Sequence, residues 1–371
     1  MILNTKTFYA VGQGGFYSER IFNEGHERAI VYDCGSDTKP MNNHMSLLNR
    51  CINESGLEKI DYVVISHLDN DHINGLKELE IYEKNIDSKW KPVIILPKPN
   101  PMDLLLFYMI ASHSAIEYYL GGMNHMRQLH VTDENGENDV IDLDVEWNGV
   151  KTVSHNFSLT TGFKKCKEKW LLKFYVDASK YQNKLTKRDI RVINSVKTFS
   201  DFEKKKKELA DIYRCSKNKL CKLKIIRKKQ GLENKGDSSE MNLSSMAMIS
   251  APQKKSLRDV NCKSGNNVSF ISWLNGDIRL KNEEEMLAIE AHFKDFLSSN
   301  IDFQVPHHGS HNNFSRLPKC KKKLRAYLWA GAENTHGHPS GTVLRKIQKE
   351  NIEFHWITEE DDHIIRQEIW V

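Results

Sequence analysis

Short apolar segments that end in polar or glycine-rich turns recur near both ends of the chain, and they predict buried strands. In the N-terminal part these segments are residues 4–11, 28–32, 60–65 and 93–96. In the C-terminal part they are residues 268–274, 301–305, 325–330 and 352–358. Segments with helical spacing of apolar positions lie between them, at residues 45–54, 76–79, 283–297 and 343–350. Strands that alternate with helices predict an α/β fold with its strands in packed sheets.

The middle of the chain has a different pattern. Residues 102–127 have helical periodicity, residues 132–144 are acidic and rich in turn residues, and residues 202–213 again favour a helix. We therefore expect three parts, namely residues 1–97, an insertion at 98–264, and residues 265–371.

Composition favours a reducing compartment. The chain has seven cysteines, an odd number, and none of them stands in C-x-x-C spacing, so neither a disulfide framework nor a thiolate zinc site is expected. The N-terminus lacks the pattern of a signal peptide, and the longest apolar run, residues 104–111, is too short to span a bilayer. We expect a cytoplasmic protein that does not enter the membrane.

Positive charge is concentrated in the middle of the chain. Residues 180–235 contain 19 Lys or Arg residues and six Asp or Glu residues, although the whole chain has a net charge of only +5. Such a basic segment on a mildly acidic body is typical of contact with nucleic acid or another polyanion. A solvated helical face, or a surface that docks a protein partner, would explain the same charges.

The most informative motif is the run Ser66–Gly75, which contains the pattern H-x-D-x-D-H followed by a glycine. Its histidines are His67 and His72, and its carboxylates are Asp69 and Asp71. The motif follows a predicted buried strand and precedes a predicted helix, so its side chains lie on a tight turn at one edge of the sheet. Imidazoles and carboxylates that converge there are suited to bind divalent metal.

This motif resembles the metal-binding signature of the metallo-β-lactamase fold. Two further strings, P-H-H-G-S at residues 306–310 and N-x-x-G-H-P-S within residues 334–340, resemble the branch that contains the soluble domain of the competence protein ComEC and bacterial phosphorylcholine esterases. The resemblance covers about residues 4–97 and 265–371. It implies an αββα metallo-β-lactamase sandwich with a large, partly helical basic insertion, whose charge lies at residues 180–235.

The resemblance also implies roles for single residues. Asp33, at the end of a strand, would orient a metal ligand, and Asp277, in an Asn-Gly-Asp turn after residues 268–274, would bridge two metals. One metal would be held by His67, Asp69 and one of His307 and His308, and the other by Asp71, His72 and His338. The wider superfamily has one more ligand histidine before the bridging Asp. Four histidines could occupy that position, but none stands in a recognisable motif: His113, His125, His130 and His155. We therefore expect His307 or His308 to take the place of the missing ligand.

The implied activity is that of a metal-dependent hydrolase, most readily a phosphodiesterase or nuclease. Two divalent ions, zinc or manganese, would share a bridging hydroxide, with Asp71 in the catalytic centre. His307, taken as the pair member that is not a ligand, would protonate the leaving group, and His308 would be the ligand. Two alternatives stay open: hydrolysis of other esters, and an effector or adaptor role in a bacterial antiviral defence system, with residues 180–235 docking a partner.

Overall fold

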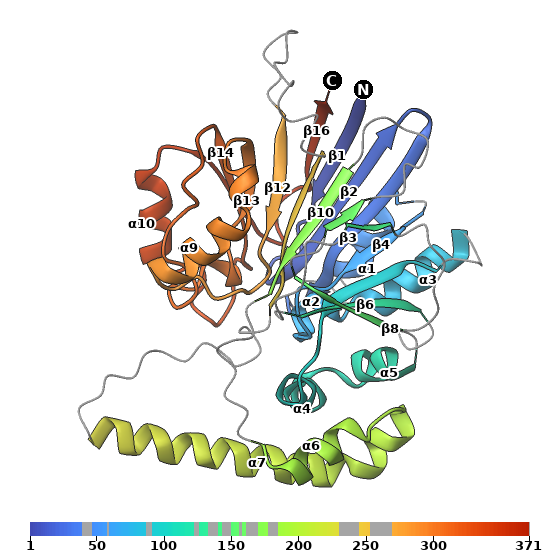
Figure 1. Ribbon diagram of the computed structural model, residues 1–371, viewed down its shortest axis with the longest axis vertical. Helices are drawn as coiled ribbons and strands as arrows, with labels where there is room; N and C mark the ends of the chain where they lie inside the picture. Colours follow the sequence, from blue (N-terminus) through green and yellow to red (C-terminus); the bar gives the residue numbers. More distant parts are fainter. Residues whose placement is uncertain are drawn as a thin grey trace.

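Two mixed β-sheets packed face to face form the centre of the protein, with helices on the outside of both (Figure 1). The computed structural model describes residues 1–38, 47–57, 59–86, 91–121, 126–132, 140–142, 150–155, 158–160, 170–176, 185–229, 245–252 and 269–370. Within these residues each sheet has eight strands. The predicted αββα sandwich is confirmed.

The first sheet is antiparallel at one side and parallel at the other. Its parallel strands β3, β4 and β5 carry the buried, β-branched segments that the sequence pattern predicts. In spatial order its strands are β16 (Ile364–Trp370), β1 (Ile2–Phe8), β2 (Gly14–Asn23), β3 (His26–Ser36), β4 (Tyr62–Val64), β5 (Val93–Pro97), β6 (Arg127–Thr132) and β8 (Val150–Ser154).

The second sheet has four parallel strands from the C-terminal part of the chain, followed by strands from the middle part. In spatial order its strands are β15 (Glu353–Ile357), β14 (Leu324–Trp329), β13 (Asn300–Gln304), β12 (Phe270–Leu274), β11 (Ala247–Pro252), β10 (Trp170–Tyr175), β9 (Ser158–Thr160) and β7 (Val140–Asp142). Because the parallel strands of a sheet end at one edge, the loops after β12, β13 and β14 meet there.

Helices cover both outer faces. The helices α1 (Leu47–Glu54), α2 (Asn70–Ile73) and α3 (Leu76–Ile86) lie on the first sheet, and α9 (Glu283–His292) and α10 (Gly341–Lys349) lie beside the second (Figure 1). The α9 helix begins with a capping box, in which Asn282 and Glu285 satisfy each other's backbone amides. Acidic residues in its first turn stabilise the helix further, because they interact favourably with the positive end of the helix dipole.

A separate helical layer lies below the sandwich in Figure 1. It consists of α4 (Pro101–Ile110), α5 (His113–Gly121), α6 (Lys187–Asn194) and the 31-residue α7 (Phe199–Lys229), and α7 packs against α4 and α5. The buried side chains of Phe202 and Leu209 make the contact face of α7. The predicted helix at residues 202–213 is therefore part of a longer helix.

The expected insertion at 98–264 is only partly an insertion. Strands β6 to β11 come from this stretch and belong to the two sheets, whereas helices α4 to α7 stand outside the sandwich. Strand β10 alternates buried and half-buried positions and β11 is buried throughout. These short strands are separated by long polar segments, and this spacing concealed the sheet pattern in the sequence.

Two strands at the ends of the chain were also missed. Strand β2 begins in the glycine cluster at residues 12–15, and β16 follows the predicted strand at residues 352–358. Both pair with β1, so the C-terminal strand completes the N-terminal sheet. The two halves of the chain are thus interlocked rather than separate.

Aromatic and charged contacts join the two sheets. Phe8 stacks on Tyr327 with ring centroids 3.9 Å apart, and the hydroxyl groups of Tyr17 and Ser272 lie 2.8 Å apart across the interface. The fully buried Lys6 forms an ion pair with Asp302 at 2.9 Å. No helix among the described residues is both long and apolar enough to cross a membrane.

Candidate metal centre

The predicted strand, turn and helix around His67 are present. Strand β4 ends at Val64, and α2 begins after Asp69, whose carboxylate accepts the backbone N–H of Asn70 at 2.9 Å as the helix N-cap. This turn directs the side chains of His67 and His72 into the protein, where they are 1% and 0% exposed. This local geometry follows directly from the sequence pattern.

Loops from the second sheet bring the remaining side chains to the same place. Gly276 has φ +51°, and a Cβ atom there would lie 2.4 Å from the Cβ of Ser66, so only glycine allows this close approach. The close approach places Asp277 beside the His67 turn. His307 and His308 follow β13 with φ values of +49° and +50°. Two consecutive non-glycine residues in the left-handed region are uncommon and typical of functional sites.

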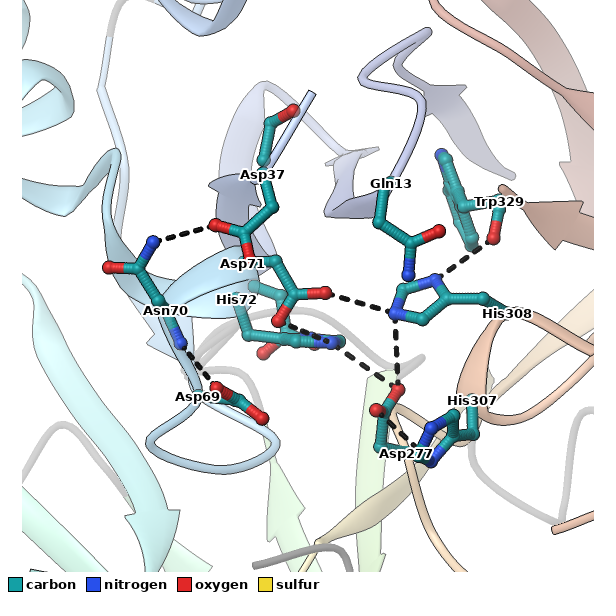
Figure 2. Close-up of polar contacts among 12 residues, drawn as sticks. Gln13, Asp37, Asp69, Asn70, Asp71, His72, Asp277, His307, His308 and Trp329 are labelled. Atoms are coloured by element: carbon teal, nitrogen blue, oxygen red, sulfur yellow. Dashed lines mark hydrogen bonds and ion pairs between the residues drawn. The ribbon is translucent and has the colours of Figure 1, made fainter. Parts of the chain in front are cut away.

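Asp277 lies at the centre of the cluster (Figure 2). Its Oδ1 atom is 3.3 Å from Nε2 of His72 and 3.7 Å from Nε2 of His308. Its Oδ2 atom is 3.9 Å from Nε2 of His67 and 3.3 Å from Nδ1 of His307. Each carboxylate oxygen therefore faces its own pair of imidazoles, as a carboxylate that bridges two cations would.

Two groups of potential ligand atoms are close enough together to hold a cation. One consists of His67, His72 and Asp277, and the other of Asp71, His72 and His308. In the second group, Nε2 of His308 lies 3.1 Å from Oδ2 of Asp71. Because the groups share His72, they are two parts of one centre.

The lack of hydrogen bonds at buried atoms also indicates that these residues could bind metal. Four buried atoms that point into the centre make no hydrogen bond: Nε2 of His67, Nε2 of His72, Nε2 of His308 and Oδ1 of Asp277. Buried polar atoms without partners cost about 1–3 kcal/mol each, so a cluster of them is not expected in a site that binds nothing. Divalent cations held by the two groups would satisfy all four.

The opposite nitrogen of each ring is fixed by the protein. Nδ1 of His72 lies 2.8 Å from Oδ2 of Asp33, and Nδ1 of His67 lies 2.9 Å from Oγ of Ser66. Nδ1 of His308 donates to the backbone carbonyl of Trp329 at 2.9 Å. These contacts direct every Nε2 lone pair inward, which is how proteins orient histidine ligands. Asp33 has the contact expected of an orienting residue.

The ionisation of these groups reflects their crowding. Burial and the neighbouring Asp71 raise the pKa of Asp69 to about 7. Burial alone would also raise the pKa of Asp277, but His307, His308 and His72 hold it well below its usual value. Burial lowers the pKa of His67 to about 3, so this ring is neutral and able to donate a lone pair near pH 7. A bound cation would offset the repulsion between the Asp69 and Asp71 carboxylates, and Asp69 would then lose its proton more readily.

The grouping differs in part from the one implied by the resemblance. His308 lies with Asp71 and His72 rather than with His67, and neither Asp69 nor His338 belongs to the two groups. The His338 ring is 5.5 Å from the His307 ring, on the more exposed side of the centre. For Asp69 and His338 the ligand role stays a prediction.

The other histidine candidates lie elsewhere. His130 contacts Gln128, His155 lies 2.8 Å from the carbonyl of Val176, and His113 pairs with Glu203. None belongs to either group, as expected from their lack of a motif. His125 lies outside the described residues.

Some residues of the centre were not predicted. Ser66 donates to Asp33 at 2.7 Å and supports His67, and its place directly before the motif was the only signal for it. Asn70, inside the motif, donates to Asp37 at 2.7 Å and accepts the N–H of Ser112 at 3.2 Å. Gln13, in the glycine cluster at residues 12–15, lies beside the centre in Figure 2.

The fold and the cluster together define an αββα sandwich protein with a buried imidazole and carboxylate centre whose residues could hold metal. Residues 7–189, just under half of the 371-residue chain, match the family model described as "Anti-Pycsar protein Apyc1". No curated protein matches. Among solved structures, the crystal structure of unliganded yeast PDE1 is similar with a TM-score of 0.41 and 10% identity, over 98% of this chain and 99% of that chain.

Proposed function

We propose that this protein is a metal-dependent hydrolase of phosphodiesters. The observation that carries the proposal is the convergence of four buried ligand atoms that make no hydrogen bond, brought together by loops of both sheets. Imidazole and carboxylate ligands in this mixture suit zinc or manganese. When bound, two such ions activate water and stabilise charge on the attacking and leaving oxygens of a phosphodiester.

Different residues would hold the two metals. Asp71, His72 and His308 form one side, and His67 with Asp277 forms the other, with Asp277 between the two. Asp69 adds a carboxylate at the edge of the turn, and His338 adds an imidazole from the loop after β14.

His307 is suited to proton transfer. Its side chain is 19% exposed, more than any member of the two groups, so substrate can reach it. Burial lowers the pKa of His307, so the ring is neutral near pH 7. It can therefore take the proton that water loses as its oxygen bonds to phosphorus, and give that proton to the oxygen that leaves.

A cyclic nucleotide is the substrate we favour. The matching family model is described as an anti-Pycsar protein, and we take this description to favour a cyclic nucleotide substrate and a connection with antiviral defence. Hydrolysis would break one phosphorus–oxygen bond of the ring and give a linear nucleoside monophosphate. The catalytic residues are the same for a linear phosphodiester.

A nucleic acid is the second candidate, and the position of α7 supports it. Ser112 binds Asn70 of the metal turn, and the next residue, His113, pairs with Glu203 of α7 at 3.3 Å. The exposed lysines Lys204, Lys206 and Lys207 follow on this helix. Their positive charge is therefore connected to the metal turn through the contacts of Ser112 and His113. The side chains of residues 217–229 lie outside the description, and so does the segment 230–244.

The test is hydrolysis by the metal-loaded protein. Zinc- and manganese-loaded samples are given 3′,5′-cyclic nucleotides, a linear oligonucleotide and bis-p-nitrophenyl phosphate, and products are separated by chromatography. Asp277→Asn, which weakens the central carboxylate at nearly equal volume, should lose activity on all three. Selective cleavage of cyclic nucleotides would decide between the two substrates.

Absence of hydrolysis by a protein that retains its metal would overturn the enzymatic proposal. It would favour the adaptor alternative, in which residues 180–235 dock a partner. Activity that survives in Asp277→Asn and in chelator would instead place the chemistry elsewhere.

A further inference from the structure

The glycine-rich loop at residues 12–15 lies against the metal centre. A Cβ atom at Gly14 would lie 2.8 Å from the carbonyl oxygen of Asp71, and one at Gly15 would lie 3.1 Å from Nδ1 of His72. Glycines at these positions let the backbone pass directly behind two ligand residues. Only Gln13 in this loop carries a side chain.

The backbone of Gln13 is held without help from its side chain. Its N–H donates to Oγ1 of Thr38 at 2.8 Å, and its carbonyl accepts the N–H of Asp37 at 2.7 Å. On the other side, Gly331 would place a Cβ 3.3 Å from the Gln13 nitrogen, next to the strand end whose Trp329 carbonyl binds His308. The loop is therefore fixed between the first and second sheets.

The carboxamide itself points into the centre. Gln13 is only 7% exposed, and its Oε1 atom is buried and makes no hydrogen bond. Figure 2 shows the amide group pointing toward the His308 ring, on the side that Asp71 also faces. A half turn of the amide exchanges its oxygen and nitrogen, so the same position offers either an acceptor or an N–H donor. A buried amide oxygen that makes no hydrogen bond is unusual, so the carboxamide is available to a ligand of the centre.

We infer that Gln13 binds the phosphoryl group of the substrate, donating its Nε2–H to a non-bridging oxygen. This inference rests on the proposed function. A neutral amide suits the position, because a lysine would repel the nearby cations and a glutamate would repel the phosphate and compete as a ligand. Gln13 would thus orient the phosphorus for in-line attack without changing the charge of the centre.

The experiment compares Gln13→Met with wild type in the zinc-loaded full-length protein. Methionine keeps the length of the side chain and removes both hydrogen-bonding atoms. The matched control is Gln128→Met, which makes the same change at a glutamine that is 5% exposed in β6 and contacts His130 rather than the centre. Measurements are bound metal, the Kd of inorganic phosphate by calorimetry, and the rate ratio for the two phosphorothioate diastereomers of a chiral phosphodiester.

Gln13→Met should bind the same amount of metal as wild type but bind phosphate roughly 10- to 100-fold more weakly, the loss expected for one hydrogen bond to a charged group. The preference between phosphorothioate diastereomers should shrink, because sulfur at the contacted position would no longer be penalised. Gln128→Met should change neither quantity.

Unchanged phosphate affinity in Gln13→Met would overturn the inference while leaving the hydrolase proposal intact. Loss of metal in this variant would also overturn it, since Gln13 would then support the ligands rather than contact substrate. A wild-type protein that takes up metal but binds no phosphate and cleaves no phosphodiester would overturn the proposed function, and the inference with it.

Discussion

Asp33 and His72 are 39 residues apart in the chain, yet Oδ2 of Asp33 lies 2.8 Å from Nδ1 of His72, and both side chains are fully buried. Burial raises the pKa of Asp33, and the neighbouring His72 opposes this effect. The same carboxylate accepts the N–H and the hydroxyl of Ser66. One residue of β3 thus orients the His72 ring and holds the turn that begins at Ser66.

Asp33→Asn tests this contact. The variant keeps the size of the side chain but replaces an anionic acceptor, so we expect metal affinity to fall 10- to 100-fold, as for other partners of ligand histidines. Competition with a fluorescent zinc chelator measures the change. The matched control is Asp61→Asn, a carboxylate at the opposite end of β4 that accepts the N–H of Ala29 at 3.0 Å. Equal affinity for zinc in both variants would contradict the role of Asp33.

Metal removal should destabilise the whole protein. The ligands come from loops of both sheets, so bound metal joins the sheets and stabilises the folded state by mass action. We expect a lower Tm in chelator than in excess zinc or manganese, and more than one metal equivalent in protein purified without chelator. Asp277→Asn provides the control, since its Tm should respond much less to metal. A Tm that chelator leaves unchanged would argue against the metal centre.

His307 and His308 should differ in what their loss removes. His308→Ala deletes a nitrogen that lies 3.1 Å from Asp71, so metal content should fall together with activity. His307→Ala should keep its metal and lose roughly 100-fold or more in kcat, the scale of a general acid–base residue. Elemental analysis and kinetics on the same samples separate the two effects. The assignment fails if His307→Ala is fully active, or if it loses metal as His308→Ala does.

The exposed lysines at the start of α7 test the nucleic-acid candidate. Replacing Lys204, Lys206 and Lys207 with Gln in an inactive Asp71→Ala background should weaken oligonucleotide binding. It should also flatten the slope of log K against log salt by about 0.7–0.9 per lost phosphate contact. A salt titration with a labelled oligonucleotide measures both. If affinity and slope stay the same, these lysines form a solvated surface or a protein-docking surface.

Acid should destabilise the metal-free protein partly through His292. Burial lowers the pKa of His292 to about 3, against about 6.5 in the unfolded chain, and its Nε2 lies 2.8 Å from the carbonyl of Phe174. Because the folded state binds the proton less readily, the free energy of unfolding should fall as the pH drops below 6.5. This group should contribute about 1–2 kcal/mol of that loss between pH 7 and pH 5.

His292→Gln should remove this part of the pH dependence. Urea denaturation of chelator-treated protein at pH 7 and pH 5 measures it, and His26→Gln, at the exposed start of β3, serves as control. Lys173 is a charged group close to the ring, and the His155 ring lies tilted beside it, with ring centroids 5.1 Å apart. An equal loss of stability in wild type and His292→Gln would show that the acid sensitivity comes from other groups.

Local sequence patterns were enough to predict the elements that carry the centre. Strand β4, the α2 turn, the Gly-Asp pair after β12 and the histidine pair after β13 all follow from local patterns, because apolar runs and the turns that end them are short-range properties. The H-x-D-x-D-H spacing also predicted that His67, Asp71 and His72 point to one place. These features need no knowledge of distant contacts.

Only the tertiary structure decided which ligands share a side of the centre and what supports them. His308 meets Asp71 because the loop after β13 of the second sheet reaches the turn after β4 of the first, so this pairing depends on how the two sheets pack. The same holds for Gln13, whose role is invisible until the glycine loop is seen behind Asp71. The strands of the middle region were hidden for a related reason, since a short strand takes its stability from its neighbours rather than from its own sequence.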